Sequence, residues 1–142
     1  MMGNAKEYLQ KMRMYDTRIE SKLLEVQALR AMATKITPTL KADMGSSSSP
    51  QDKLDDAVAK IVDLEREIDR DIDAYVDLKR EVTAKLEKLA NPAHYKVLHQ
   101  RYFLYYTFER IATDMYYSFR GVCYLHGRAL QAFDELLQKE EG

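Results

Sequence analysis

Apolar residues recur at heptad spacing along the first part of the chain. With Met12 at position a, eight of nine seam positions are apolar. The a and d positions run Tyr8, Met12, Tyr15, Ile19, Lys22, Val26, Leu29, Ala33 and Ile36. This pattern predicts a helix with a coiled-coil seam. We expect Lys22, the polar member, to lay its stem along the seam and keep its ammonium in water. The pattern ends at Thr37-Pro38, because a residue before proline disfavours the helical conformation.

A second heptad pattern follows the stretch MGSSSS, which has the composition of a flexible loop. With Leu54 at position a, nine of the eleven seam positions are apolar. They run Leu54, Ala57, Ile61, Leu64, Ile68, Asp71, Tyr75, Leu78, Val82, Lys85 and Leu89. Ser49 is expected as the N-cap and Pro50 as the first helical residue. The pattern stops at Asn91-Pro92, where Asn91 is placed to cap a following helix.

The two heptad segments differ in net charge. Residues 1–44 hold eight Lys and Arg against five Asp and Glu, whereas residues 51–90 hold eight against twelve. Two such helices joined by a loop over residues 37–49 predict a long antiparallel coiled-coil hairpin, which forms a domain over residues 1–90. A two-helix hairpin has a thin core, so we expect it to pair with a second copy and make the protein a homo-oligomer.

Length and composition limit the class of protein. The chain has 142 residues, of which 32% are charged and 46% hydrophobic, as is typical of a folded domain. No stretch approaches 18 consecutive apolar residues, and the first residues, MMGNAKEYLQ, lack the apolar core of a signal peptide. We therefore expect a cytoplasmic protein that makes no contact with a membrane. The single cysteine, Cys123, excludes an internal disulfide and a multi-cysteine zinc site.

The composition changes at Pro92, where a second domain, residues 91–142, is predicted. Helices are expected over residues 92–105, 108–114 and 119–138, with Thr107 and Ser118 as N-caps of the second and third. Apolar residues spaced by three and four predict a compact trihelical unit. Those expected to face inward are Val97, Leu98, Tyr102, Ile111, Ala112, Met115, Val122, Leu125, Ala129, Leu130 and Phe133. Three residues remain for the second turn, which is the connection length of a helix-turn-helix.

The segment RYFLYYTFERIATDMYYSFRGVCYLHGRAL resembles the C-terminal DNA-binding unit of bacterial sigma factors, region four. The matching residues are Arg101, Tyr102, Thr107, Glu109, Ile111, Ala112, Ser118, Val122, Arg128, Ala129 and Leu130. With a long helical part before this unit, the chain is similar to small phage-encoded regulators of the ArpU and RinA type. The resemblance implies an all-α, non-enzymatic transcriptional regulator of a phage or prophage that binds double-stranded DNA.

The resemblance also implies roles for individual residues. The third helix would enter the major groove, where Arg120 and Tyr124 reach bases and Phe119 touches a thymine methyl group. Gly121 would let the backbone come close to DNA or to a partner helix, or it is simply tolerated. The implied phosphate contacts are Thr107, Arg110, Ser118 and Arg128. A dimer would read two half-sites, and RNA polymerase is a second implied partner.

Two features depart from the family's pattern. The glycine of the family's turn is replaced by Tyr116, which costs energy in a left-handed conformation unless the turn is reshaped. The exposed face of the third helix has one cation in its first turns, Arg120, beside Phe119, Cys123 and Tyr124. A face of this kind also suits an apolar partner. The alternative function is therefore a protein-interaction module that binds RNA polymerase or another regulator instead of DNA.

An enzymatic alternative rests on the acidic second helix. All-helical nucleotide pyrophosphatases hold magnesium with carboxylates at helical spacing. The candidates here are Asp52, Asp55, Asp56, Glu65 and Asp69. Most of them occupy exposed heptad positions, and the first helix has no matching acidic pair, so we predict no enzymatic activity, metal or cofactor. Of the other polar candidates, His126 is expected as a surface residue and Cys123 as a small, partly buried side chain.

Overall fold

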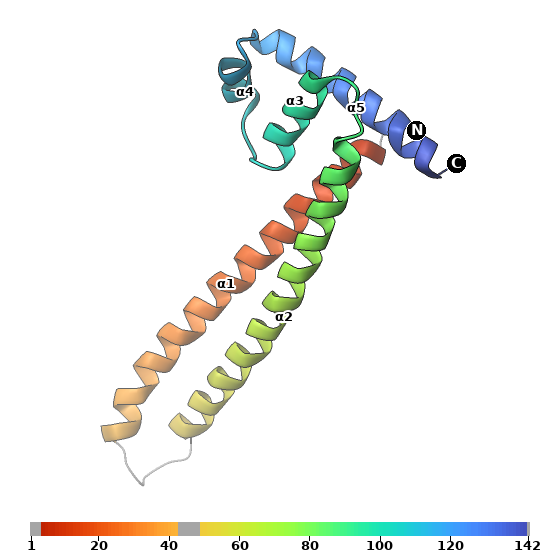
Figure 1. Ribbon diagram of the computed structural model, residues 1–142. Coiled ribbons are helices and arrows are strands. Elements are labelled where there is room, and N and C mark those ends of the chain that lie inside the picture. The colour runs from red at the N-terminus through yellow and green to blue at the C-terminus, as the bar shows by residue number, and fades with distance from the viewer. Residues whose placement is uncertain (1–3, 43–48, 142) are drawn as a thin grey trace. The chain divides into compact units, whose positions relative to one another are not determined.

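The protein is all-helical in the computed structural model, which describes residues 4–42 and 49–141 (Figure 1). The helices are α1 (Asn4–Ala42), α2 (Ser49–Leu86), α3 (Pro92–Tyr102), α4 (Phe108–Met115) and α5 (Phe119–Glu141). Helices α1 and α2 are long and pack antiparallel, and the three shorter helices that follow pack together. The predicted fold, a helical hairpin followed by a small trihelical unit, is confirmed.

Burial along the hairpin follows the two predicted heptad frames. The buried seam residues are Met12, Ile19, Val26, Leu29, Ala57, Ile68 and Val82. All other seam positions are half-buried. The ammonium of Lys22 was expected in water, and it also forms an ion pair, with Nζ 2.7 Å from Oδ2 of Asp71, one of the two polar residues of the opposite seam. This ion pair was not predicted, because the pattern of a single helix does not show which residue of the partner helix stands opposite.

Helix α1 ends later than predicted. It continues through Pro38 to Ala42, so the first part of the predicted loop is helical. A proline this close to the end of a helix removes only one intrahelical hydrogen bond. The hydroxyl of Thr37 donates to the Ala33 carbonyl, four residues earlier, at 2.9 Å. The rest of the predicted loop, residues 43–48, and the side chain of Ser49 lie outside what the structure describes.

Helices α2 and α3 end earlier than predicted. Helix α2 stops at Leu86, and the backbone N–H of Leu89 donates to the Leu86 carbonyl at 3.0 Å in the turn that follows. Helix α3 stops at Tyr102, three residues short of the predicted end. Tyr105 has a φ of 59°, and this left-handed conformation cannot continue a right-handed helix. The N–H of Tyr106 instead closes the turn on a carbonyl of α3.

Contacts divide the chain into two compact units. One comprises Tyr15–Ala74, and the other comprises the first residues up to Met14 together with Tyr75 onward. The second unit has one hydrophobic core to which all five helices contribute. Its buried residues are Ala5, Leu9, Met12, Val82, Leu86, Val97, Leu98, Tyr102, Ile111, Ala112, Val122, Ala129, Phe133 and Leu137. The domain boundary predicted at residue 90 follows the change in composition. The contacts instead group the beginning of α1 and the end of α2 with the three short helices.

Candidate nucleic-acid interface

Helices α4 and α5 begin at the predicted N-caps. Oγ1 of Thr107 accepts a hydrogen bond from the backbone N–H of Arg110 at 3.2 Å. Oγ of Ser118 accepts one from the N–H of Gly121 at 2.9 Å. Each cap satisfies a donor that the first helical turn leaves unpaired. Both hydroxyl groups are on exposed residues and use only an acceptor lone pair in the cap, so their O–H groups remain free to donate.

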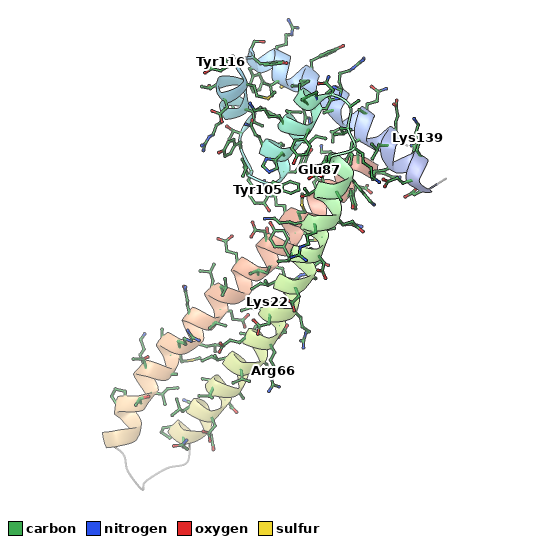
Figure 2. All side chains as sticks on the ribbon, in the orientation of Figure 1. Lys22, Arg66, Glu87, Tyr105, Tyr116 and Lys139 are labelled. Atoms are coloured by element: carbon green, nitrogen blue, oxygen red, sulfur yellow. The ribbon has the colours of Figure 1, made fainter. Side chains whose placement is uncertain are left out.

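The turn between α4 and α5 is held in a left-handed conformation at Tyr116, with φ 60° and ψ 39°. The N–H of Tyr117 donates to the Ala112 carbonyl at 2.9 Å, and that of Tyr116 to the Thr113 carbonyl at 3.4 Å. This is the Schellman arrangement that usually requires glycine. The turn is therefore not reshaped around the bulky residue. The Tyr116 side chain is 96% exposed, so it accepts the backbone strain without steric conflict with the core (Figure 2).

The side chains predicted to face inward do pack in the core of this unit. Those that are buried are Val97, Leu98, Tyr102, Ile111, Ala112, Val122, Ala129 and Phe133. Met115, Leu125 and Leu130 are half-buried and pack against them. Buried Ala112 of α4 is small enough to bring this helix close to α5. The core therefore fixes which side of α5 is left to solvent.

The solvent-facing side of α5 carries three of the residues implied as DNA contacts. Arg120, Tyr124 and Arg128 are exposed and follow each other at intervals of four, so they form one row along the helix. Tyr124 is 67% exposed, and Cζ of Arg128 lies 5.9 Å from the centroid of its ring. Arg120 forms no ion pair with any residue that the structure describes. Its guanidinium is thus available to a ligand.

Arg110 and Gly121, two other implied contacts, have partners within the protein. The Arg110 guanidinium stacks on Tyr106, with Cζ 3.8 Å from the ring centroid, and its Nε lies 3.9 Å from a carboxylate oxygen of Asp114. Gly121 is half-buried against the cap, and a Cβ there would lie 3.0 Å from Oγ of Ser118. The absence of a side chain at Gly121 therefore makes room for the cap.

Four exposed aromatic residues surround the turn. Tyr116, Tyr117, Phe119 and Tyr124 are 96%, 42%, 51% and 67% exposed, and we call them the turn aromatic group. Cys123 on the same stretch is exposed as well, and the expectation of a partly buried side chain was wrong. Exposed aromatic residues in such number are characteristic of surfaces that bind other molecules.

His126 is half-buried and not a surface residue, contrary to the expectation from the sequence. Its Nε2 lies 2.9 Å from the hydroxyl of Tyr102, and its ring packs edge-on against Phe108 with centroids 5.0 Å apart. Burial, together with the charges of Arg101 and Lys6, lowers the pKa of His126 to about 4. Sequence spacing gave no signal for this arrangement, because its members come from α1, α3, α4 and α5.

No family model, curated protein or solved structure matches this chain. None of the helices in the described part of the chain is long and apolar enough to cross a membrane. Within residues 4–42 and 49–141, no three His, Cys, Asp or Glu side chains are grouped so that they could hold a metal ion.

Proposed function

We propose that the protein is a sequence-specific DNA-binding transcriptional regulator, of the type encoded by phages and prophages, and that α5 is its recognition helix. The proposal rests mainly on the exposed row of Arg120, Tyr124 and Arg128, which begins directly after the tight turn at Tyr116. An α-helix fits the major groove, and side chains on its first turns reach the edges of base pairs. The resemblance to sigma region four, carried by the sequence of residues 101–130, points to the same use.

Several residues of this face have specific roles in the proposal. Arg120 is free to donate two hydrogen bonds to O6 and N7 of a guanine, and exposed Phe119 packs against a thymine methyl group. Thr107 and Ser118 donate their free hydroxyl protons to phosphates at the N-termini of α4 and α5, where backbone N–H groups and the helix dipole favour anions. Arg128 adds a cation to this row.

A single copy of this face has few cations, so its affinity for DNA is expected to be low and to fall steeply with salt. Pairing of the hairpin with a second copy joins two such faces and raises the apparent affinity. Apolar side chains that the seam does not bury support this pairing. Those exposed within residues 15–74 are Leu23, Leu24, Met32, Val58, Val62 and Ile72.

Binding to a pool of random-sequence duplexes, followed by selection of the tightest sequence, tests the proposal. At roughly 50 mM salt, where phosphate contacts are strong, we expect the wild-type protein to bind and to enrich a motif. On the selected duplex, Arg120→Ala should weaken binding by about 5- to 150-fold, because a bidentate arginine–guanine contact contributes roughly 1–3 kcal/mol.

Arg66→Ala is the matched control for this experiment. Arg66 is an exposed arginine of α2 (Figure 2), and its replacement removes the same charge without changing any residue of α5. It should leave the affinity for the selected duplex unchanged. If the wild-type protein fails to bind any duplex at this salt, or if both variants weaken binding equally, α5 is not a recognition helix for DNA.

The turn aromatic group favours a second candidate function, binding of RNA polymerase or another regulator. Exposed tyrosine and phenylalanine are common anchors of protein interfaces, because they bury a large apolar area at low entropic cost. In this case the chain would bind purified bacterial RNA polymerase in the absence of DNA. Tyr124→Ser should then reduce the affinity for polymerase much more than Arg120→Ala, whereas DNA recognition predicts that both variants weaken duplex binding.

A further inference from the structure

A cavity of about 340 Å³ lies within the unit formed by residues up to 14 and from 75 onward. It is lined by Lys6, Gln10 and Arg13 of α1, by Arg101 and Tyr102 of α3, and by His126 of α5. Its volume falls at the lower end of the range of small-ligand pockets, roughly 300–1,000 Å³. The cavity is separate from the exposed row on α5 that the proposed function uses.

The walls of this cavity carry positive charge and no carboxylate. Lys6 and Arg13 are seven residues apart on α1, so both face the same side of the helix, and Arg101 contributes a third cation from α3. None of the ion pairs among the described residues involves any of these three side chains. Three cations gathered without a counter-charge attract an anion.

Aromatic rings, and not carboxylates, hold the two arginines in place. Cζ of Arg101 lies 4.3 Å from the ring centroid of Phe108, and its Nη1 donates to the Tyr106 carbonyl at 2.9 Å. Cζ of Arg13 lies 5.2 Å from the ring centroid of Tyr105. Stacking on a ring orients a guanidinium but leaves most of its N–H groups free to donate. Such pre-positioned donors lower the entropic cost of binding a ligand.

Two residues of the cavity wall, Tyr105 and His126, have an unusual backbone conformation and a specific hydrogen bond. Tyr105 lines the cavity with a left-handed backbone at φ 59°, a conformation that costs a bulky residue energy and often occurs at functional sites. The neutral ring of His126 also lines the cavity, and its Nε2 lies 2.9 Å from the hydroxyl of Tyr102, a second lining residue. Burial and, to a smaller extent, the charges of Arg101 and Lys6 lower the pKa of His126.

We propose that the cavity is a binding site for a small molecule that carries a phosphate group, with Lys6, Arg13 and Arg101 as its principal contacts. A phosphate monoester is close to a dianion at neutral pH and offers three terminal oxygens, which match three cations from two helices. Arginine in particular pairs with phosphate through two parallel N–H groups. The volume leaves space for an organic group beside the phosphate.

Calorimetric titration of the full chain with adenosine monophosphate and with inorganic phosphate tests this site. The test variant is the double substitution Lys6→Gln/Arg13→Gln, and the matched control is Lys11→Gln, which removes an exposed charge of α1 that does not line the cavity. We expect saturable binding of adenosine monophosphate that is weaker by at least about tenfold in the double variant. The Lys11→Gln protein should bind as the wild type does.

The pKa of His126, followed by NMR, gives a second readout, and loss of folding is recognised because it raises this pKa toward 6.5 in the absence of ligand. A bound anion offsets the positive potential at the ring, so saturation with adenosine monophosphate should raise this pKa in the wild type and not in the double variant. A circular dichroism melt of each variant verifies that it is folded.

Three results would overturn the proposal. The first is no saturable binding of either probe up to roughly 10 mM, weaker than the usual range of specific ligands. The second is an equal loss in the double variant and in Lys11→Gln, which would indicate unspecific charge attraction. The third is that the wild type and the double variant both fail to bind adenosine monophosphate, while the double variant binds duplex DNA less well than the wild type. This result would mean that Lys6 and Arg13 contact the phosphates of DNA. Arg120→Ala should not change the binding of adenosine monophosphate. Failure of the DNA-binding proposal can therefore be distinguished from failure of the phosphate-site proposal.

Discussion

Lys22 and Asp71 contact each other in the seam of the hairpin, with Nζ of Lys22 2.7 Å from Oδ2 of Asp71. Their side chains are only 21% and 15% exposed, and Glu67 adds a second carboxylate 3.4 Å from the same ammonium. Each residue is a polar exception in an otherwise apolar heptad pattern. A register shifted by one heptad would place each of them against apolar side chains, so the pair favours the observed register.

Asp71→Leu should lower the stability of the hairpin, because the Lys22 ammonium loses its shorter ion pair and keeps only the more exposed Glu67 carboxylate at 3.4 Å. The double variant Lys22→Leu/Asp71→Leu should regain most of the loss, since two apolar residues pack in place of the ion pair. Urea unfolding of these two variants and of Lys22→Leu, followed by circular dichroism, measures the free energies of unfolding from which the coupling of the pair is obtained. Glu65→Leu is the control, because its pair with Arg30 is 3.5 Å long and exposed. Additive effects of the two seam substitutions would show that the pair does not act as a unit.

Tyr116→Gly should stabilise the protein by about 0.5–1 kcal/mol, although it removes a large side chain. The left-handed backbone costs a non-glycine residue roughly 1–2 kcal/mol, and glycine avoids this cost. Part of the gain is lost again, because glycine raises the conformational entropy of the unfolded chain. The Tyr116 side chain is almost fully exposed, so little packing is lost. The free energy of unfolding in urea measures the change.

Tyr117→Gly is the matched control for this substitution. Tyr117 does not share the positive φ of Tyr116, so glycine there relieves no strain and should be neutral or destabilising. Equal effects of the two substitutions would mean that the left-handed conformation of Tyr116 is not strained in solution.

Leu9→Ala should destabilise the three short helices, even though Leu9 is far from them in the sequence. Leu9 is fully buried in the core that contains Phe133, and truncation of a buried leucine costs about 2–5 kcal/mol. Leu24→Ala in the same helix is the control, because Leu24 is 58% exposed. Near-UV circular dichroism of the tyrosines during urea unfolding reports on this core.

The fragment 91–142 should not unfold cooperatively when it is produced alone. It lacks Ala5, Leu9, Val82 and Leu86, which are buried against its apolar residues in the intact chain. A small core without these partners exposes apolar surface that the short helices cannot cover themselves. A sharp thermal transition in this fragment would show that the helix-turn-helix folds independently.

Stability should fall between pH 6.5 and about 4 because of His126. In the unfolded chain its pKa is near 6.5, whereas burial and nearby cations lower the pKa to about 4 in the folded protein. The unfolded state therefore takes up a proton first as the pH falls, so this contribution to stability is full above pH 6.5 and is lost toward pH 4. We expect an effect on the order of 1–2 kcal/mol, reduced by the ring's partial exposure.

His126→Gln isolates this contribution, because glutamine does not titrate. The unfolding free energies of the two proteins are compared at several pH values. The difference between them cancels the contributions of the carboxylates and of the other histidines to the pH dependence. One of these is His99, whose pKa is also lowered by burial. The wild-type protein should show the steeper decline. Parallel pH profiles would mean that His126 is protonated equally in the folded and unfolded chain.

Local sequence signals predicted most of the fold and the position of the candidate interface. Heptad spacing identified the seam, since a buried stripe repeats at the period of the helix. Asn91, Thr107 and Ser118 marked three helix starts, because an N-cap hydrogen bond joins residues two or three positions apart. Such signals depend on neighbours along the chain, so one sequence is enough to identify them. They also placed Arg120 and Tyr124 on the exposed side of α5.

Contacts between distant segments were settled only by the tertiary structure. The sequence indicated neither that Lys22 meets Asp71 nor that the first turns of α1 complete the core around Phe133. It left open whether Tyr116 would reshape the turn, which the backbone hydrogen bonds of α4 decided in favour of the left-handed conformation. The cavity around Arg101 was equally invisible, because its cations are separated by most of the chain. Helical periodicity determines which face of each helix is buried, whereas the packing of several helices determines which residues meet.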